Sequence, residues 1–422
     1  KTVASSDISA VAEHTKKAVY LNDGEAAVLR PDSASFYNFN GEPVEKELTV
    51  LDVGSGDYGK NGMAHYMLKE IFEQPDAVRR TLGAHIKNGE VAFDFSLFDG
   101  NAVRNIKKIC FVACGSAYHA GVAAAAVFRA LTGIASYAFI ASEFRYMEPM
   151  TDSSTLVVPI SQSGETADTL ASLREAKRRG ARTVGVVNVV DSLIAKECGD
   201  VIYTCAGQET AVATTKGYTT QLAALYMFAI WFGRELGVLA AEREAELTRS
   251  LTQLPHALET VLQSDVHAKK HASDLKDASS MFFIGRGLDY AAALEAALKM
   301  KEITYIHAES CPAGELKHGT ISLVEPGMRV FAFLSQPVTA SKTVNNIKEV
   351  RARGAYTICC APQSIAERLT DIDELIVLPD IEPLFFNIIE VVPFQFYAYY
   401  TALARGCDID KPRNLAKSVT VE

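Results

Sequence analysis

The sequence predicts an α/β fold of two consecutive doubly wound parallel sheets, preceded by a short β-rich segment. Short apolar runs rich in β-branched residues alternate with helical patterns from about residue 65 onward. Landmarks of the form strand, glycine turn and helix recur 172 or 174 residues apart, which indicates a duplicated domain. The 422 residues are also too many for a single hydrophobic core. We therefore expect three parts, at residues 1–62, 63–245 and 246–422.

The first 60 residues have the pattern of short strands and turns. Residues 18–21 and 26–29 predict a hairpin through the turn at residues 22–24, and residues 39–41 indicate another turn. The glycine-rich segment LDVGSGDYG at residues 51–59 imitates a nucleotide-binding turn. Such a motif needs a helix directly after it and then a second strand, and neither follows here, so we interpret this segment as a linker.

The first repeat contains two strands that each end in a polar turn. The strand at residues 109–113 leads into Cys114 and Gly115, and an alanine-rich helical pattern follows. The strand at residues 155–160 leads into the hexapeptide SQSGET, and a helical pattern runs over residues 168–176. In an open α/β sheet, ligands bind at the carboxyl ends of the strands, so these turns are candidate binding sites.

The hexapeptide SQSGET at residues 161–166 predicts an anion cradle. Free backbone N–H groups at a helix N-terminus attract negative charge, and the hydroxyls of Ser161, Ser163 and Thr166 can add hydrogen bonds to phosphate oxygens. Gly164 allows the backbone to approach the ligand closely. The alternative is an ordinary Ser/Thr helix cap, but the position after a buried strand of a β/α unit favours a ligand site.

The second repeat copies the first but changes its cradle. Residues 281–287 repeat residues 109–115, and Ser335-Gln336 repeats Ser161-Gln162. Pro337 stands where the first repeat has Ser163, and it brings neither a hydroxyl nor a backbone N–H. We therefore expect one phosphate site per pair of repeats, with the second repeat free to supply catalytic groups.

Composition excludes several classes of function. A net charge of −9 argues against general nucleic-acid binding. The longest uncharged apolar run, residues 222–233, is too short to span a bilayer, and no signal peptide is visible. The cysteines show no C-x-x-C pair and no metal-ligand spacing, which predicts reduced thiols in a cytoplasmic protein. They are Cys110, Cys114, Cys198, Cys205, Cys311, Cys359, Cys360 and Cys407.

Taken together, these motifs resemble the sugar isomerase (SIS) fold, and in particular the isomerase portion of the glutamine–fructose-6-phosphate aminotransferase family. The resemblance runs from about residue 63 to the C-terminus. The segments that carry it are MLKEIFEQP (67–75), ACGSAYHA (113–120), SQSGET (161–166), VATTK (212–216), LKMKEITYIHAE (298–309), GELKHG (314–319) and PRNLAKSVTVE (412–422).

Residues 1–60 resemble the end of the glutaminase domain that precedes the isomerase in this family. The N-terminal cysteine nucleophile of that domain is absent from this sequence, so we expect no glutamine hydrolysis by this chain alone. In the family, that domain supplies ammonia from glutamine to the isomerase.

The resemblance implies a sugar-phosphate site that binds fructose 6-phosphate and releases glucosamine 6-phosphate. Ala117 departs from many relatives, which carry a hydroxyl there. The implied binding residues are Cys114, Gly115, Ser116, Ser161, Gln162, Ser163, Thr166, Ala213 and Thr214.

Lys299 and Glu302 share one face of a helical run in the second repeat. A carboxylate can carry a proton while a neighbouring ammonium stabilises a developing oxyanion. The alternative is a surface ion pair, although the flanking sequence is not polar. By resemblance, Glu302 is the base that transfers a proton between C1 and C2, and Lys299 is its electrostatic partner.

Two further residues owe their predicted roles to the resemblance. A single histidine in a glycine-bracketed loop is most often structural, but by resemblance His318 opens the sugar ring from the neighbouring subunit of a homodimer. A lysine in a C-terminal tail is ordinarily solvated, but by resemblance Lys417 attacks the C2 carbonyl to form a Schiff base. Such a lysine requires the tail to pack over the site.

We therefore expect an enzyme that needs no metal and no organic cofactor. The alternative is a non-catalytic SIS module that binds a sugar phosphate and regulates a partner. Such a module would keep the cradle but would not need Glu302, Lys299, His318 and Lys417 together.

Overall fold

The computed structural model describes residues 2–4, 15, 17–22, 24–50, 59–147 and 151–421. The chain forms two compact units, residues 1–59 and 60–422. Most of the segment that imitates a nucleotide-binding turn, residues 51–58, lies outside the described residues, as does Asp23 in the first predicted turn.

In the first unit, the predicted hairpin is wrong. Strand β2 (Glu25–Arg30) pairs antiparallel with β3 (Ser33–Asn38), while β1 (Lys17–Ala18) pairs with β4 (Thr49–Val50). The chain reverses at residues 31–32, where a proline with its fixed φ favours a tight turn. The second predicted turn is confirmed, because the Gly41 N–H donates to the Asn38 carbonyl at 2.9 Å.

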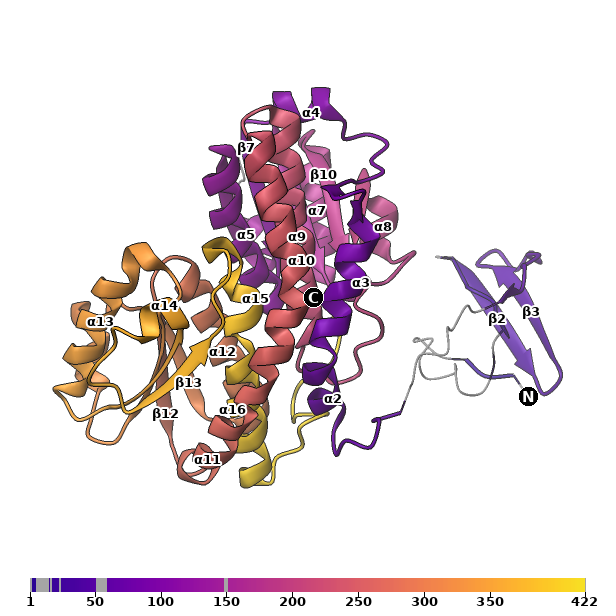
Figure 1. Cartoon of the computed structure of the whole chain (residues 1–422). Helices are drawn as coiled ribbons and strands as arrows, with labels where there is room; N and C mark the ends of the chain where they lie inside the picture. The colour runs from indigo at the N-terminus through magenta and orange to yellow at the C-terminus, as the bar shows by residue number, and fades with distance from the viewer. Residues whose placement is uncertain are drawn as a thin grey trace. The chain divides into compact units, whose positions relative to one another are not determined.

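The second unit contains two five-stranded sheets, one in each repeat (Figure 1). The first sheet is parallel throughout, in the order β11-β10-β9-β7-β8. Its strands are β7 (Lys108–Ala113), β8 (Ala135–Ile140), β9 (Thr155–Ser161), β10 (Arg182–Val187) and β11 (Asp200–Tyr203). Strand β9 is buried along its whole length, as expected for a central strand covered on both faces.

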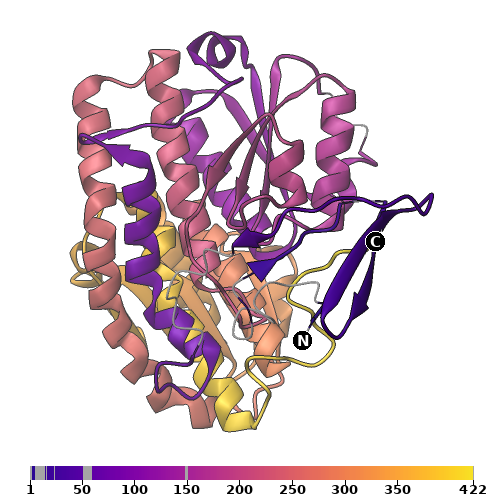
Figure 2. The ribbon, with the colours of Figure 1, turned by 90° about the vertical axis from the view of Figure 1, so that its right-hand side faces the viewer.

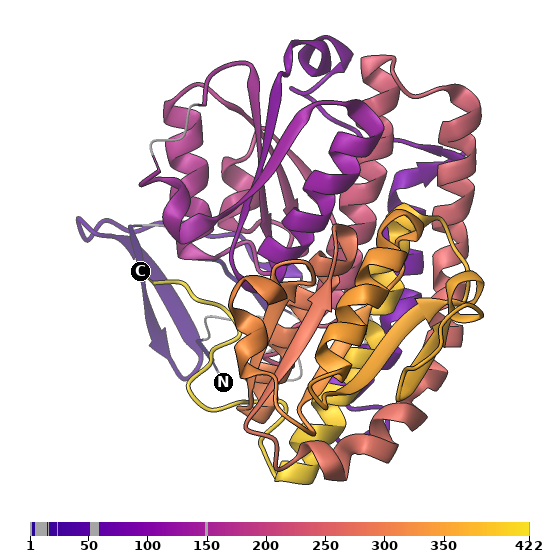
Figure 3. The same cartoon turned by 90° about the vertical axis from the view of Figure 1, so that its left-hand side faces the viewer.

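The second sheet repeats this arrangement in the order β13-β12-β14-β15-β16, again with all strands parallel. Its strands are β12 (Ser280–Gly285), β13 (His307–Pro312), β14 (Arg329–Phe333), β15 (Tyr356–Pro362) and β16 (Glu374–Leu378). In each repeat the strand order reverses beside the first strand, which is the doubly wound topology. The predicted fold class is confirmed, and Figure 3 shows the two repeats one above the other.

The helices of the first repeat enclose an unusually apolar central helix, α9 (Lys216–Leu236). Residues 216–233 of this helix are all buried, which explains why residues 222–233 form the longest apolar run of the sequence. Helix α9 packs against α3 and α5. The helices that precede it are α2 (Tyr66–Phe72), α3 (Gln74–His85), α4 (Gly100–Asn105), α5 (Gly115–Thr132), α6 (Ala141–Phe144), α7 (Ala167–Arg178) and α8 (Leu193–Glu197), with the short strands β5 (Ile86–Lys87) and β6 (Glu90–Val91) between α3 and α4.

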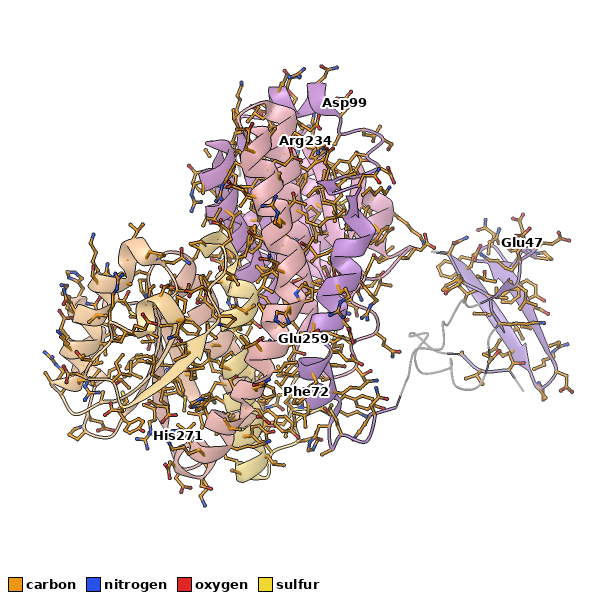
Figure 4. All side chains as sticks on the ribbon, viewed as in Figure 1. Glu47, Phe72, Asp99, Arg234, Glu259 and His271 are labelled. Carbon is orange, nitrogen blue, oxygen red and sulfur yellow. The ribbon has the colours of Figure 1, made fainter. Side chains whose placement is uncertain are left out.

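The two repeats are joined through helices. Helix α12 (Leu288–Thr304) of the second repeat packs directly against α5 of the first, and it also contacts α16 (Val392–Arg405). Helix α10 (Ala241–Val261) runs along α9, and Arg234 at the upper end of α9 in Figure 4 pairs with Glu244 at 2.9 Å. The remaining helices are α11 (Asp265–Leu275), α13 (Pro337–Arg351), α14 (Gln363–Ala366), α15 (Phe386–Glu390), and the 3₁₀ turns η1 (Leu262–Ser264), η2 (Leu316–His318), η3 (Thr320–Leu323) and η4 (Pro383–Phe385).

The C-terminal tail is anchored to both repeats. After α16 it runs upward in Figure 2 to the end of the chain. The Asp410 carboxylate accepts the N–H groups of Tyr66 and Met67 at 2.9 and 3.0 Å, at the start of α2. The Arg413 N–H donates to the Tyr305 hydroxyl at 2.9 Å. These hydrogen bonds fix the path of the tail before it reaches Lys417.

Among the residues that the structure describes, no helix is both long and apolar enough to cross a membrane.

Candidate active site

The predicted cradle lies at the point where the strand order of the first sheet reverses. Strand β7 ends at Ala113 and leads into Cys114, Gly115 and Ser116, which begin helix α5. The neighbouring strand β9 ends at Ser161 and leads into SQSGET, which begins helix α7. The two turns therefore meet at the carboxyl edge of adjacent strands, where α/β sheets bind their ligands.

Hydrogen bonds inside the hexapeptide orient its hydroxyls. The Ser161 and Thr166 hydroxyl oxygens lie 2.9 Å apart, and the Ser161 oxygen accepts the Gly164 N–H at 3.0 Å. The Ser163 oxygen accepts the Glu165 N–H at 3.2 Å, which leaves its own O–H free to donate. The Glu165 carboxylate accepts the Leu193 N–H at 3.0 Å. The cradle thus offers hydroxyl donors to an anion while its one carboxylate is engaged elsewhere.

Gly164 is required by both conformation and space. Its φ is +69°, in the left-handed region that side chains disfavour. A Cβ at this position would lie 2.0 Å from the Ser192 hydroxyl oxygen and 2.5 Å from the Ser192 Cβ. A side chain here would displace the cradle from helix α8, whose Ile194 N–H donates to the Gly164 carbonyl at 3.0 Å.

Replacing Gly164 with alanine is expected to weaken sugar-phosphate binding, because the cradle backbone must move to relieve the collision with Ser192. We expect Kd for fructose 6-phosphate to rise by about tenfold or more, which corresponds to roughly 1–3 kcal/mol of backbone strain. Isothermal titration calorimetry measures this change.

Gly180→Ala is the matched control for this substitution. Gly180 has a φ of +84°, but a Cβ there would meet no atom within 4 Å. The Gly180→Ala variant therefore has the strain of a side chain at positive φ but no collision with a neighbouring atom. Equal affinities of the two variants for fructose 6-phosphate would contradict the role given to Gly164.

The structure brings Lys417 of the tail to the first repeat. The Lys417 ammonium lies 2.7 Å from the Glu209 carboxylate and 3.5 Å from the Thr214 hydroxyl. The next hydrogen bond of the tail is made to the cradle helix itself, because the Ala167 N–H of α7 donates to the Val419 carbonyl at 3.1 Å. The tail therefore packs over the predicted site, as a reactive lysine there requires.

Contacts around Gly217 place the cradle and Lys417 in one cluster. A Cβ on Gly217 would lie 2.9 Å from the Glu209 carboxylate, 3.2 Å from the Thr214 hydroxyl and 3.3 Å from Gln162 Cγ. Gln162 belongs to the cradle, and Glu209 and Thr214 hold Lys417. The SQSGET turn and the Lys417 ammonium therefore lie close together in the folded chain.

Lys299 and Glu302 form the predicted pair on α12. Their charged atoms lie 2.5 Å apart, and Glu295, one turn earlier, lies 3.5 Å from the same ammonium. Burial lowers the pKa of Lys299, but the carboxylates of Glu302, Glu295 and Glu209 outweigh burial and raise it. Lys299 therefore remains an ammonium although its side chain is only 1% exposed, whereas Glu302 is 21% exposed and open to a ligand.

Glu295 connects this pair to the first repeat. Its carboxylate accepts the Ser116 hydroxyl at 2.8 Å and lies 2.8 Å from His119 Nδ1. Ser116 and His119 belong to α5, so one buried carboxylate on α12 contacts both the predicted phosphate turn and Lys299. This contact holds helix α12 in place relative to the predicted cradle.

His318 is not brought into this cluster within the chain. It ends the turn η2, and it is exposed. None of the hydrogen bonds or ion pairs of the described residues joins its ring to Lys299, Glu302 or Lys417. Of the other predicted residues, Ala213 is buried and Cys114 is partly buried beside the start of α5.

The corresponding place in the second repeat is filled by the chain itself. The Asp289 carboxylate accepts the Ser335 N–H at 3.0 Å and the Ser335 hydroxyl at 2.5 Å. Burial raises the pKa of Asp289 to about 6, against the effect of these hydrogen bonds. Pro337 predicts the loss of a second phosphate site, and the position of the Asp289 carboxylate, which was not predicted, favours the same interpretation.

The sequence analysis also missed Glu209 and Glu295. Glu295 precedes Lys299 by four residues on a predicted helix, which is a recognisable ion-pair spacing. Glu209 lies in the connection between β11 and α9, and no local pattern connects it to Lys417.

Two parallel doubly wound domains are the architecture of the SIS-domain class of proteins, and a model of the SIS domain matches residues 102–231 and 274–405. The glutamine–fructose-6-phosphate aminotransferase (isomerizing) of Clostridium tetani is 45% identical over 418 residues, which cover 99% of this chain and 69% of the relative. That of Caldanaerobacter subterraneus is 44% identical over 420 residues, with the same coverage. The chain belongs to the glutamine–fructose-6-phosphate aminotransferase family of SIS-domain proteins.

A solved structure agrees with this assignment. The C-terminal domain of glucosamine-fructose-6-phosphate aminotransferase from Francisella tularensis superposes with a TM-score of 0.81 at 37% identity. The superposition covers 84% of this chain and 100% of that domain.

Proposed function

We propose that this chain converts fructose 6-phosphate and ammonia to glucosamine 6-phosphate, which is in keeping with its similarity to proteins named glutamine–fructose-6-phosphate aminotransferase (isomerizing). The observation that carries the proposal is the position of Lys417. Its ammonium lies beside Thr214 and Glu209, next to the sugar-phosphate cradle, although it comes from the last residues of the chain. A tail with only a structural role would not need an amine beside the sugar-phosphate cradle.

The cradle accounts for phosphate binding. The phosphate would accept hydrogen bonds from the hydroxyls of Ser161, Ser163 and Thr166, and the positive end of the α7 dipole favours its charge. The turn from Cys114 to Ser116 closes the same edge of the sheet. With the phosphate anchored in this way, the reactive end of the sugar would point out of the cradle, toward Lys417 and the α12 carboxylates.

The chemistry is then divided between the tail and α12. Lys417 forms a Schiff base at C2 of the open sugar, and ammonia replaces it to leave an imine. Glu302 then transfers a proton between C1 and C2, which converts the 2-imino ketose to the 2-amino aldose. Lys299 stabilises the oxygen charge that develops during this transfer, because its buried ammonium stays protonated.

Two further components complete the proposed enzyme. We propose that His318, which is exposed here, opens the sugar ring in the site of a second copy, so that the working enzyme is a homodimer. Ammonia would come from glutamine through a glutaminase domain. The eight cysteines are all free thiols, which supports a reducing compartment, and we propose the cytoplasm.

Incubation with fructose 6-phosphate tests the proposal. The chain alone is expected to release glucose 6-phosphate, and glucosamine 6-phosphate when ammonium is added, as measured by coupled enzymatic assay and mass spectrometry. Binding of the sugar phosphate without either product would instead support the alternative, a regulatory SIS module.

A further inference from the structure

Glu209 is a buried carboxylate at the site, and the mechanism above gives it no role. Its side chain is fully buried, whereas that of its partner Lys417 is 24% exposed. The Glu209 carboxylate accepts the N–H groups of Thr215 and Gly217 at the start of α9, each at 2.9 Å, and it also accepts the Thr214 hydroxyl. These donors hold the carboxylate in one orientation, with Oε2 2.7 Å from the Lys417 ammonium.

The surroundings keep Glu209 as the anion that faces Lys417. Burial raises its pKa, but Lys417, Thr214 and Gly217 outweigh burial and lower the pKa to about 2. The titratable groups nearby are Glu70 of α2, Lys216 of α9 and Lys299 of α12. Burial, together with the charge of Glu209, raises the pKa of Glu70 to about 8, so Glu70 is protonated at neutral pH. Lys216 is already paired with Glu73 at 2.8 Å.

We propose that Glu209 is a further catalytic residue, which draws the Lys417 ammonium into the site and accepts the proton that Lys417 must lose before it attacks C2. This inference rests on the proposed function. It assigns to Glu209 a direct contact with the reacting nitrogen, which lies at hydrogen-bonding distance from its carboxylate.

The proton balance closes on these two side chains. The Lys417 ammonium gives one proton to Glu209 Oε2, and the nitrogen lone pair forms the bond to C2 while the carbonyl π pair moves to oxygen. A second proton passes from nitrogen to that oxygen, which gives a neutral carbinolamine. Glu209 then returns its proton to the departing hydroxyl, which leaves as water, and the nitrogen lone pair forms the C=N bond. Ammonium and ketone thus become iminium and water.

The test is the pH dependence of Schiff-base formation at Lys417. Wild-type protein and Glu209→Gln are mixed with fructose 6-phosphate and cyanoborohydride, and the rate of adduct formation on the Lys417 peptide is followed by mass spectrometry. Because the wild-type ion pair transfers its proton internally, its rate should be nearly constant from roughly pH 6 to 7.5, below the titration of Glu70. In the Glu209→Gln variant, Lys417 must lose its proton to water. The rate of adduct formation should then be about a hundredfold below that of wild type at pH 6, and it should rise by about tenfold per pH unit.

Two control variants separate the outcomes. Glu259→Gln makes the same chemical change on an exposed carboxylate of α10, labelled in Figure 4, and should match wild type. Glu209→Asp keeps the charge and should restore the flat profile at a reduced rate. If Glu209→Gln does not fold, the pH dependence of adduct formation in wild-type protein is the test by itself. A tenfold rise in the wild-type rate per pH unit would overturn the proposal.

Parallel profiles for wild type and Glu209→Gln would leave Glu209 with only a structural role and would also overturn the proposal. The complete absence of a Lys417 adduct in wild-type protein would instead overturn the proposed function itself.

Discussion

Replacing Lys417 with arginine is expected to abolish isomerisation of fructose 6-phosphate while leaving the fold intact. Arginine keeps the cation that Glu209 faces at 2.7 Å, but a guanidinium stays protonated and is not a nucleophile. We expect the rate of glucose 6-phosphate release to fall by at least about a thousandfold, because the covalent intermediate cannot form. Coupled assay of the product measures the loss, and calorimetry should find fructose 6-phosphate still bound.

Lys417→Ala makes the same test with the ion pair removed. It leaves the buried Glu209 without its cation, so a lower Tm is expected together with the loss of activity. Lys411→Ala is the matched control, since Lys411 is an exposed lysine of the same tail. Retention of more than a tenth of wild-type activity in Lys417→Arg would remove the Schiff base from the mechanism.

The strand, turn and helix that form the proposed sugar-phosphate cradle could be predicted because their signals are local. An apolar strand, the hexapeptide SQSGET and a helical pattern follow one another within about 25 residues, and the structure places β9, the turn and α7 in that order. The topology then brings this turn beside that of residues 114–116, because strands β7 and β9 are neighbours. Nothing beyond secondary structure and the rule for parallel sheets was needed.

The contacts made by Lys417 could not be predicted in this way. Its partner Glu209 is 208 residues away in the sequence, and only the folded chain brings the two side chains together. The role of Lys417 was predicted only from resemblance to a family. The buried Glu209 carboxylate has four hydrogen-bond donors, Lys417 among them, and this explains physically why the tail passes over this place.

Two wrong or incomplete predictions show how local signals compete. The first unit offers several turn signals within 20 residues, and the turn at residues 31–32 determines the hairpin in place of the turn at residues 22–24. In the second repeat, Pro337 predicts the loss of the phosphate site, but the carboxylate that occupies the corresponding position belongs to Asp289. The contact between Asp289 and Ser335 joins two distant positions of one repeat, and no local sequence pattern predicts it.

Replacing Glu302 with glutamine is expected to stop proton transfer but not Schiff-base formation. Glutamine has nearly the same shape, and Lys299 keeps Glu295 as a partner at 3.5 Å, so the fold should survive. Because the amide cannot accept a proton, we expect kcat for glucose 6-phosphate formation to fall by about 10²–10⁴. KM should change little, since the proposed phosphate site is the cradle at the start of α7 and not on α12.

The decisive measurement separates the two steps in one sample. The Lys417 adduct should still form in Glu302→Gln after reduction, while exchange of the C1 hydrogen with deuterated water, followed by NMR, should be lost. Glu302→Asp keeps a carboxylate one methylene further from the sugar, and it should recover part of the exchange. Because Glu302 is 21% exposed and Lys299 only 1%, the carboxylate is the member of the pair that can reach a bound sugar. Wild-type exchange in Glu302→Gln would move the proton transfer to another group on α12, and loss of the adduct would show that Glu302 acts before the Schiff base forms.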